Sequence, residues 1–140
     1  MRASRLLGGL AALALTAVAG QARAATFVVN SAADTTDGTC GVAVGQCTLR
    51  EAIEDVVATA GRDTIAFDPS VFPRSVQNQI VITSPLPVIA DAAGTVVDGA
   101  GARVLIIRGG GASEGLVFTS PSGIPLAKVT VANLVVTGFF

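Results

Sequence analysis

The sequence predicts an all-β chain wound as a parallel β-helix, with a single α-helix capping its N-terminal end. One amphipathic helical pattern occurs early in the chain. After it, short apolar runs follow one another, separated by glycine, proline, serine and aspartate. The chain has 140 residues, of which 51% are hydrophobic. This length and composition suit one domain that buries a core of its own.

Residues 1–24 have the pattern of a secretory signal peptide. Arg2 and Arg5 supply a positive start, and residues 6–19 form an apolar run without a charge. Ala22 and Ala24 then provide the small-x-small pattern that signal peptidases accept. The apolar run is too short to cross a bilayer core, which needs about 20 residues. We therefore expect export to the periplasm, the extracellular space or the cell surface, with Ala24 as the last residue before cleavage.

The net charge of the remaining chain limits which classes of partner it is expected to bind. Removal of residues 1–24 leaves six basic and ten acidic residues, a net charge of −4. A mildly acidic surface without a basic cluster argues against nucleic acid. No transmembrane segment is expected after the signal peptide is removed. A cell-surface glycan or protein stays open as a partner.

Two cysteines, Cys40 and Cys47, are the only ones in the sequence. Exported chains fold in oxidising surroundings, so we expect these two residues to form a disulfide. A zinc site is the alternative. It is disfavoured because the sequence has no histidine and no second cysteine pair.

A first strand is predicted over residues 26–30, and a turn-rich loop follows it over residues 31–38. Asp34 and Asp37 give this loop a faint likeness to a calcium site. The alternate carboxylates and the later glutamate of an EF-hand are missing, however. A turn stabilised by aspartate side chains is favoured, and no cofactor is expected.

The clearest helix begins after Thr48, which is a good N-cap residue, and Glu51 completes a capping box. One face of this helix is apolar and carries Leu49, Ala52, Ile53, Val56, Val57 and Ala60. The opposite face is charged and carries Arg50, Glu51, Glu54 and Asp55. Gly61 stands where a left-handed residue ends a helix. We expect the apolar face to be buried and the charged face to meet water.

Strands are predicted over residues 64–67, 79–83, 95–98, 104–107, 116–119, 129–132 and 134–137. Three similar runs begin at Val96, Leu116 and Leu134. Their starts are spaced by roughly 20 residues, which suits the coils of a parallel β-helix. A sandwich would instead show tight Asn-Gly hairpin turns. Asp98 and Asn133 fit the turns between strands.

Residues 47–53, Cys-Thr-Leu-Arg-Glu-Ala-Ile, resemble the motif that names the CSLREA domain of secreted bacterial proteins. Residues 29–31 upstream and 63–67 downstream also resemble sequences of the same family. Thr48 replaces the family's serine and keeps the N-cap hydroxyl. Such proteins usually continue well beyond the length of this chain. The resemblance implies that the chain is exported and forms a right-handed, pectin-lyase-like β-helix. It implies no activity, because the family is defined by its sequence pattern.

The helix has a physical role that does not depend on the resemblance. The end of a β-helix exposes unpaired strand edges and an apolar interior, and such edges recruit other chains. A helix laid across that end covers both, as terminal caps do in solenoids. We therefore assign residues 25–62 to a strand, a disulfide loop and a capping helix, whose cap face is Leu49, Ile53, Val56 and Val57. Residues 63–140 are assigned to incomplete coils.

Catalytic residue types are scarce. The sequence has no histidine, tyrosine or tryptophan, which excludes a Ser–His or Cys–His nucleophile within this chain. Some β-helix enzymes cleave polysaccharides with calcium-bound carboxylates and a basic residue. The residues here that would supply such groups are Asp91, Asp98, Arg103 and Arg108, and nothing in the sequence indicates that they converge.

The sequence therefore predicts an exported or cell-surface module with a structural, adhesin-like or scaffold role and no catalysis of its own. Two alternatives stay open. One is the N-terminal fragment of a polysaccharide lyase or hydrolase of the β-helix type. The other is a truncated gene product without independent function. Residues 134–140 end on an apolar strand and two phenylalanines and would leave an uncapped coil, through which we expect the mature chain to self-associate.

Overall fold

The computed structural model describes residues 22–108, 114–120, 125 and 128–139. Residues 1–21 of the predicted signal peptide lie outside this part, as does Phe140. The elements in chain order are β1 (Thr26–Val29), α1 (Leu49–Ala58), β2 (Asp63–Phe67), β3 (Asn78–Ile82), β4 (Thr95–Asp98), β5 (Val104–Arg108), β6 (Thr130–Ala132) and β7 (Leu134–Thr137). The described chain is thus mostly strands with one short helix. None of its helices is long and apolar enough to span a membrane.

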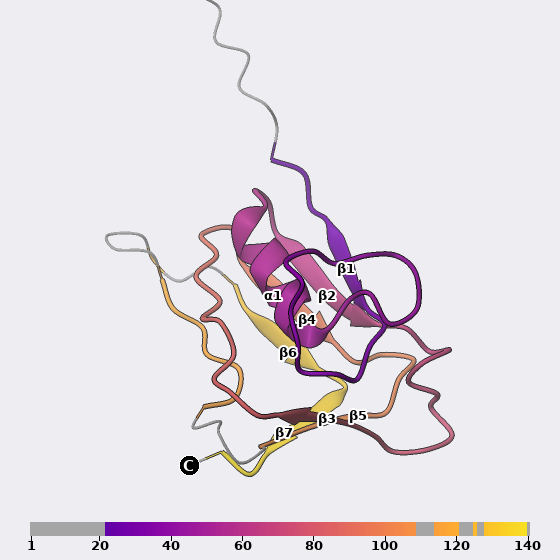
Figure 1. Cartoon of the computed structure of the whole chain (residues 1–140). Helices are drawn as coiled ribbons and strands as arrows, with labels where there is room; N and C mark the ends of the chain where they lie inside the picture. The colour runs from indigo at the N-terminus through magenta and orange to yellow at the C-terminus, as the bar shows by residue number, and fades with distance from the viewer. Residues whose placement is uncertain (1–21, 109–113, 121–124, 126–127, 140) are drawn as a thin grey trace, which may run out of the picture.

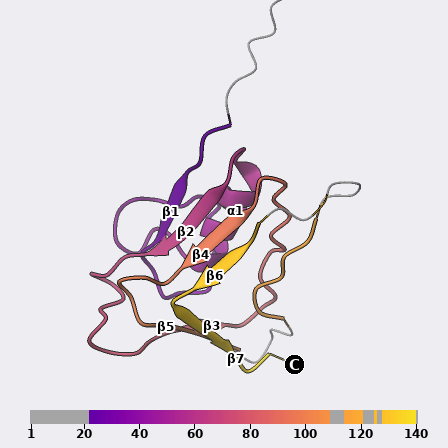
Figure 2. The ribbon, with the colours of Figure 1, turned by 180° about the vertical axis from the view of Figure 1, so that it is seen from behind.

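The strands form two sheets in which every pairing is parallel. The first sheet has the order β1-β2-β4-β6 and the second has the order β3-β5-β7. Figure 2 shows the strands of the first sheet side by side in this order, with the second sheet below them. From β2 onward the chain alternates between the sheets, one strand in each. Each return to a sheet adds a strand next to the preceding one.

The distance in sequence between paired strands gives the length of one full circuit. In the first sheet, Ile65 pairs with Val97, and Val97 pairs in turn with Val131. In the second sheet, Ile80 pairs with Ile106. One circuit therefore takes about 30 residues, a length within the range of solenoid repeats.

The shorter repeat expected from the sequence is wrong. Val96 lies in β4 of the first sheet, whereas Leu134 lies in β7 of the second. The predicted strand over residues 116–119 is not formed, and Phe118 instead makes an isolated parallel bridge with Ile89. The three similar runs thus occupy three different positions around the circuit. The spacing of about 20 residues separates runs that follow one another in the chain, not strands that pair. A single sequence does not distinguish these two distances.

Alternate side chains of the strands point into one core between the sheets. In β2, three positions are buried and the two between them are half-buried, as expected for a strand with one face inward. Phe67 meets Phe72 edge to face, with ring centroids 5.7 Å apart. The fully buried strand residues of this core are Val29, Ile65, Ile80, Ile82, Val97 and Ile106.

Turns of successive circuits stack closely where β4 ends. A Cβ atom at Gly99 would collide with the carbonyl oxygen of Asn133, so only glycine fits there. Asn133 itself has a φ of 57°, and its Nδ2 atom donates to Asp98 Oδ1 at 2.7 Å. Asp98 Oδ1 also accepts from the backbone N–H of Ala100 at 2.9 Å. The interpretation of Asp98 and Asn133 as turn residues is confirmed.

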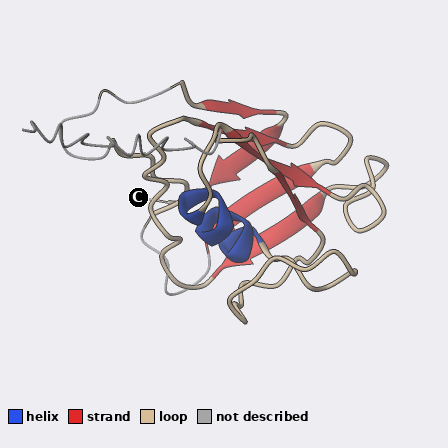
Figure 3. Ribbon diagram, turned by 90° about the horizontal axis from the view of Figure 1, so that it is seen from above, coloured by secondary structure: helices blue, strands red, loops and turns tan. Residues whose placement is uncertain are grey.

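The helix α1 follows β1 in the chain and packs against β1 and β2. Figure 3 shows it beside the strands, and the four residues of its apolar stripe are completely buried: Leu49, Ala52, Ile53 and Val56. Two residues predicted for this face are exposed, however. Val57 is 43% exposed because it lies at the border of the stripe. Ala60 is exposed because the helix has already ended at Ala58.

Gly61 has the left-handed backbone predicted for it, with a φ of 127°, but not as the end of the helix. The helix ends earlier because Thr59 is already extended, with φ −99° and ψ 141°. A Cβ atom at Gly61 would lie 2.5 Å from the carbonyl oxygen of Arg23. Glycine is therefore required here both by the backbone conformation and by the close passage of the chain before β1.

Substitutions at Ile53 and Val57 test which part of the helix seals the core. Ile53→Ala should lower the free energy of unfolding by about 2–5 kcal/mol, because it empties a completely buried site. Val57→Ala should change it by less than about 0.5 kcal/mol. Far-UV circular dichroism during urea unfolding measures both, as the chain has no tryptophan or tyrosine for fluorescence. Equal losses in the two variants would contradict this division of the helix.

Candidate functional site

The sequence led us to expect that the charged face of α1 meets water, but Arg50 and Glu51 on this face are buried, and Glu54 and Asp55 are half-buried. The loop of residues 30–47, here called the cap loop, lies against this face (Figure 1). Arg50 is 9% exposed and Glu51 only 4%. The expectation failed because helical periodicity shows which side chains are polar but not whether another segment of the chain covers them. This buried polar surface is the candidate functional site.

Arg50 is the centre of the site and reaches two other segments of the chain. Its Nη2 and Nε atoms donate to Asp34 Oδ1 of the cap loop at 2.7 and 3.1 Å, and the two side chains form an ion pair. Its Nη1 atom donates to the carbonyl oxygen of Pro85 at 2.7 Å. Its Nη2 atom also lies 2.9 Å from both oxygens of Ser84, the carbonyl and the hydroxyl. The planar guanidinium fits several acceptors at once, which lysine would not.

Asp34 continues this contact from the other side. Its Oδ2 atom accepts from the backbone N–H of Thr83 at 2.7 Å and from the Thr83 hydroxyl at 2.9 Å. Thr83 directly follows β3, the first strand of the second sheet. Asp34 and Arg50 together therefore fasten the cap loop and α1 to the exit of β3.

Glu51 holds the beginning of the helix to the cap loop. Its Oε2 atom accepts from the backbone N–H of Thr48 at 2.7 Å, and Glu51 N–H donates to the Thr48 hydroxyl oxygen at 3.2 Å. These two bonds are the expected capping box. The Glu51 Oε1 atom accepts from the backbone N–H of Asp37 at 2.8 Å, and the Thr48 hydroxyl donates to the carbonyl oxygen of Thr35 at 2.8 Å. One helical turn thus organises the first half of the cap loop.

The second half of the cap loop is closed by the predicted disulfide between Cys40 and Cys47. The backbone N–H of Cys40 donates to Asp55 Oδ2 at 3.1 Å, and the Thr36 hydroxyl donates to Glu54 Oε2 at 3.0 Å. Both carboxylates therefore bind the loop. The two aspartates that suggested a calcium site are also engaged within the protein, because Asp34 pairs with Arg50 and Asp37 Oδ1 accepts from Thr39 N–H.

Asn30 is part of the site, in a role that was not predicted from the sequence. It is 3% exposed. Its Oδ1 atom accepts from the backbone N–H groups of Gln46 and Cys47 at 3.0 and 2.8 Å, and its Nδ2 atom donates to the carbonyl oxygen of Gly41 at 3.0 Å. Asn30 thus closes the cap loop from β1. Its place directly after the first strand was the available signal, since an asparagine there satisfies backbone groups of a loop that returns to it.

Burial and hydrogen bonding oppose each other at the two carboxylates of the site. Burial of Asp34 acts to raise its pKa, but the hydrogen bonds from Thr83 and Arg50 outweigh it, so the pKa lies below its ordinary value. The pKa of Glu51 is lowered in the same way: its burial is outweighed by hydrogen bonds from Thr48 and Asp37. Both groups are therefore ionised at neutral pH.

The residues considered for polysaccharide cleavage are not brought together. Asp91 precedes β4 and Asp98 ends it, so the length of a strand separates them. Asp91 accepts from Ala93 N–H at 2.8 Å and from the Thr95 hydroxyl at 3.0 Å, which is a turn contact. The side chain of Arg108 lies outside the part that the structure describes.

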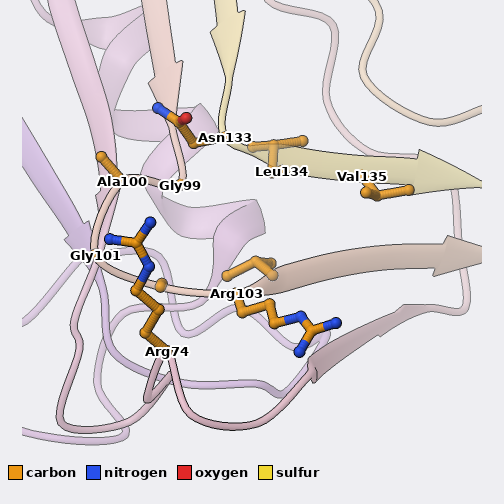
Figure 4. Close-up of a pocket in the computed structure, with 10 residues that line it drawn as sticks. Arg74, Gly99, Ala100, Gly101, Arg103, Asn133, Leu134 and Val135 are labelled. Carbon is orange, nitrogen blue, oxygen red and sulfur yellow. The ribbon is translucent and has the colours of Figure 1, made fainter.

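Arg103 lines an open pocket of about 770 Å³ whose wall begins at Gly99, directly after Asp98 (Figure 4). Arg74 and Arg103 line this pocket together with residues 99–102, Val104 and residues 133–135. Figure 4 shows the Arg74 side chain extending toward Gly101, while the Arg103 guanidinium points away from it. None of the lining residues is acidic or aromatic. The pocket offers positive charge but no group for acid–base catalysis and no ring on which a sugar would stack.

In the described ranges, no three histidine, cysteine, aspartate or glutamate residues are grouped so as to hold a metal ion. No family model, curated protein or solved structure matches the chain.

The lowered pKa values predict how stability depends on pH. A carboxylate whose pKa is lower in the folded than in the unfolded protein stabilises the fold above its unfolded pKa, and this stabilisation is lost as the pH falls through the folded value. Asp34 and Glu51 should therefore give full stability above about pH 5 and a steep loss below about pH 4. Urea unfolding at a series of pH values measures the slope.

Asp34→Asn should lower stability at pH 7 by about 3 kcal/mol, because it leaves Arg50 buried without its counter-ion. It should also make the loss below about pH 4 shallower. Glu114→Gln, at an exposed position, is the control. An Asp34→Asn variant with the wild-type slope would contradict the assigned role of the carboxylate.

Proposed function

We propose that this chain is an exported or cell-surface, non-enzymatic module with a right-handed parallel β-helix. Residues 25–62 serve as its cap and residues 63–140 as its first coils. The module acts as a scaffold or adhesin-like element, and a surface glycan or protein is its class of partner. The observation that carries this proposal is that the polar groups of the helix, centred on Arg50, bind the chain itself. A site whose charged groups are all engaged internally holds a structure together.

Parallel pairing supports the β-helix. The strands from β2 to β7 alternate between two sheets, and the turns after β4 and β6 stack through Gly99 and Asn133. The bridge between Ile89 and Phe118 adds a third place where successive circuits touch. Crossovers between parallel strands of one sheet are right-handed in nearly all proteins, which favours a right-handed coil.

The chain order supports a capping role for α1. The helix lies between β1 and β2 of the first sheet, just as β3 lies between β2 and β4. In the first circuit it thus takes the place that a strand of the second sheet takes in later circuits. Arg50 then contacts the chain directly after β3. Since α1 itself packs on β1 and β2, the helix joins the first sheet to the exit of the first strand of the second sheet.

Three features support export. The leader sequence has a positive start, an apolar run and a small-x-small end, as in secretory signal peptides. The disulfide between Cys40 and Cys47 suits an oxidising compartment. The resemblance of residues 47–53 to the CSLREA motif points to the same address. Self-association through the last strands belongs to this proposal, since β6 and β7 each pair on one side with a strand of the described chain and are only partly buried.

Expression of the full chain in a bacterium tests address and activity together. We expect an oxidised, shortened chain outside the cytoplasm, because the leader directs export and the compartment permits the disulfide. When purified, it should release no reducing sugar and no unsaturated product from pectic and other acidic polysaccharides in the presence of calcium. Leu13→Arg, which places a charge in the apolar run, is the control that should stay in the cytoplasm.

Retention of the unaltered chain in the cytoplasm would contradict the exported address. Robust turnover of a polysaccharide by the purified chain would contradict the non-enzymatic role and favour a lyase or hydrolase.

A further inference from the structure

Asp63, the first residue of β2, carries a buried oxygen without a partner. The residue is 0% exposed. Its Oδ1 atom accepts from the backbone nitrogen of Ala25 at 2.7 Å. Its Oδ2 atom has no hydrogen-bond partner. Among the described residues, it is the only buried side-chain nitrogen or oxygen without one. No side-chain cation of the described chain forms an ion pair with Asp63.

A carboxylate in this setting is incompletely satisfied. An ionised group removed from water needs an opposite charge or several hydrogen bonds to replace its hydration. One peptide N–H supplies a single hydrogen and no net charge. A buried polar atom left unpaired therefore calls for an explanation. The nitrogen of Ala25, which donates to Asp63, provides an explanation for the unpaired oxygen.

The nitrogen of Ala25 belongs to the peptide bond at which cleavage is expected. Residues 22–24 are exposed and have no regular structure, although Arg23 passes close to Gly61 just before β1. Ala22 and Ala24 carry the small side chains that a signal peptidase accepts. Hydrolysis there consumes one water. The carbonyl carbon of Ala24 gains an oxygen and leaves as a carboxylate, while the nitrogen of Ala25 becomes an amine that takes up the released proton.

We propose that Asp63 is the internal receptor for the N-terminal ammonium group that cleavage creates at Ala25. This inference rests on the proposed export. The nitrogen already lies 2.7 Å from Oδ1, so the ion pair forms where the chain now sits. Cleavage replaces one N–H by three and adds a unit positive charge beside Oδ2, the oxygen that lacks a donor.

The pair fixes the start of the fold. Ala25 is held in place by Thr64, whose N–H donates to the Ala25 carbonyl oxygen at 2.9 Å, and by the pairing of β1 with β2 that follows. β1 is an edge strand of the first sheet and leads directly into the cap loop. The uncleaved chain therefore folds to a less stable form, and removal of the leader completes the structure.

The experiment uses the chain exported and processed from its full-length precursor. Intact mass shows whether the product begins at Ala25. A second precursor carries one extra serine between Ala24 and Ala25, which moves the ammonium group one residue away. We expect this extension to lower the melting temperature by roughly 5–10 °C, measured by circular dichroism. In an Asp63→Asn background the same extension should have little effect, because the counter-ion is gone.

The reactivity of the amine gives a second measurement that needs no variant. The processed chain would hold two amines, the N-terminus and Lys128, the sole lysine, which is exposed. A free α-amine has a pKa of about 7.7–8.0 against about 10.4 for lysine, so it is ordinarily modified first at neutral pH. Paired with Asp63, it should react after Lys128 in reductive methylation of the folded protein.

Two results would separate this inference from the proposed export. A chain that begins at Ala25, melts at the same temperature with the extra serine and reacts first at its N-terminus would overturn the pairing with Asp63 and leave export intact. A chain that keeps its leader in the cell would overturn the export proposal, and the pairing with it.

Discussion

The buried ion pair of Arg50 and Asp34 is the interaction on which the N-terminal end of this fold depends. Burying two charges costs several kcal/mol each in desolvation, and their attraction offsets this cost only when further hydrogen bonds complete the site. Here Thr83, Ser84 and Pro85 supply those bonds. The pair is therefore stable only when the cap loop, α1 and the exit of β3 are all in place, and the three segments are ordered together.

At this end of the protein, apolar contacts bury hydrophobic surface and polar contacts fix the path of the cap loop. The apolar stripe of α1 removes hydrophobic surface from water, but such burial is not directional and does not fix where the cap loop runs. Asn30, Glu51 and Arg50 fix it, since each binds particular groups of the chain at hydrogen-bond distance. Asp63 also binds one particular group, the backbone nitrogen of Ala25. An ammonium group at this nitrogen would satisfy the hydrogen bonding of the carboxylate.

Much of the fold was predictable from the sequence because local patterns carry it. The capping box at Thr48 and most of the strands follow from residue types at fixed spacing. The coil length was not predictable, because pairing is set between distant segments and neighbouring apolar runs look alike. The buried state of Arg50 was missed for a related reason: its acceptors, Asp34 and the carbonyl of Pro85, lie 16 and 35 residues away, and no helical pattern reports them.

Amide hydrogen exchange in the wild-type protein and in an Arg50→Lys variant tests most directly whether Arg50 fastens the cap loop and α1 to the exit of β3. Lysine keeps the charge but loses the forked donors. If Arg50 has this role, the protection of the Thr83 and Asp37 amides, which donate to Asp34 and Glu51, falls about tenfold or more, while that of Ile106 in β5 is kept. Unchanged protection at Thr83 and Asp37 would contradict it.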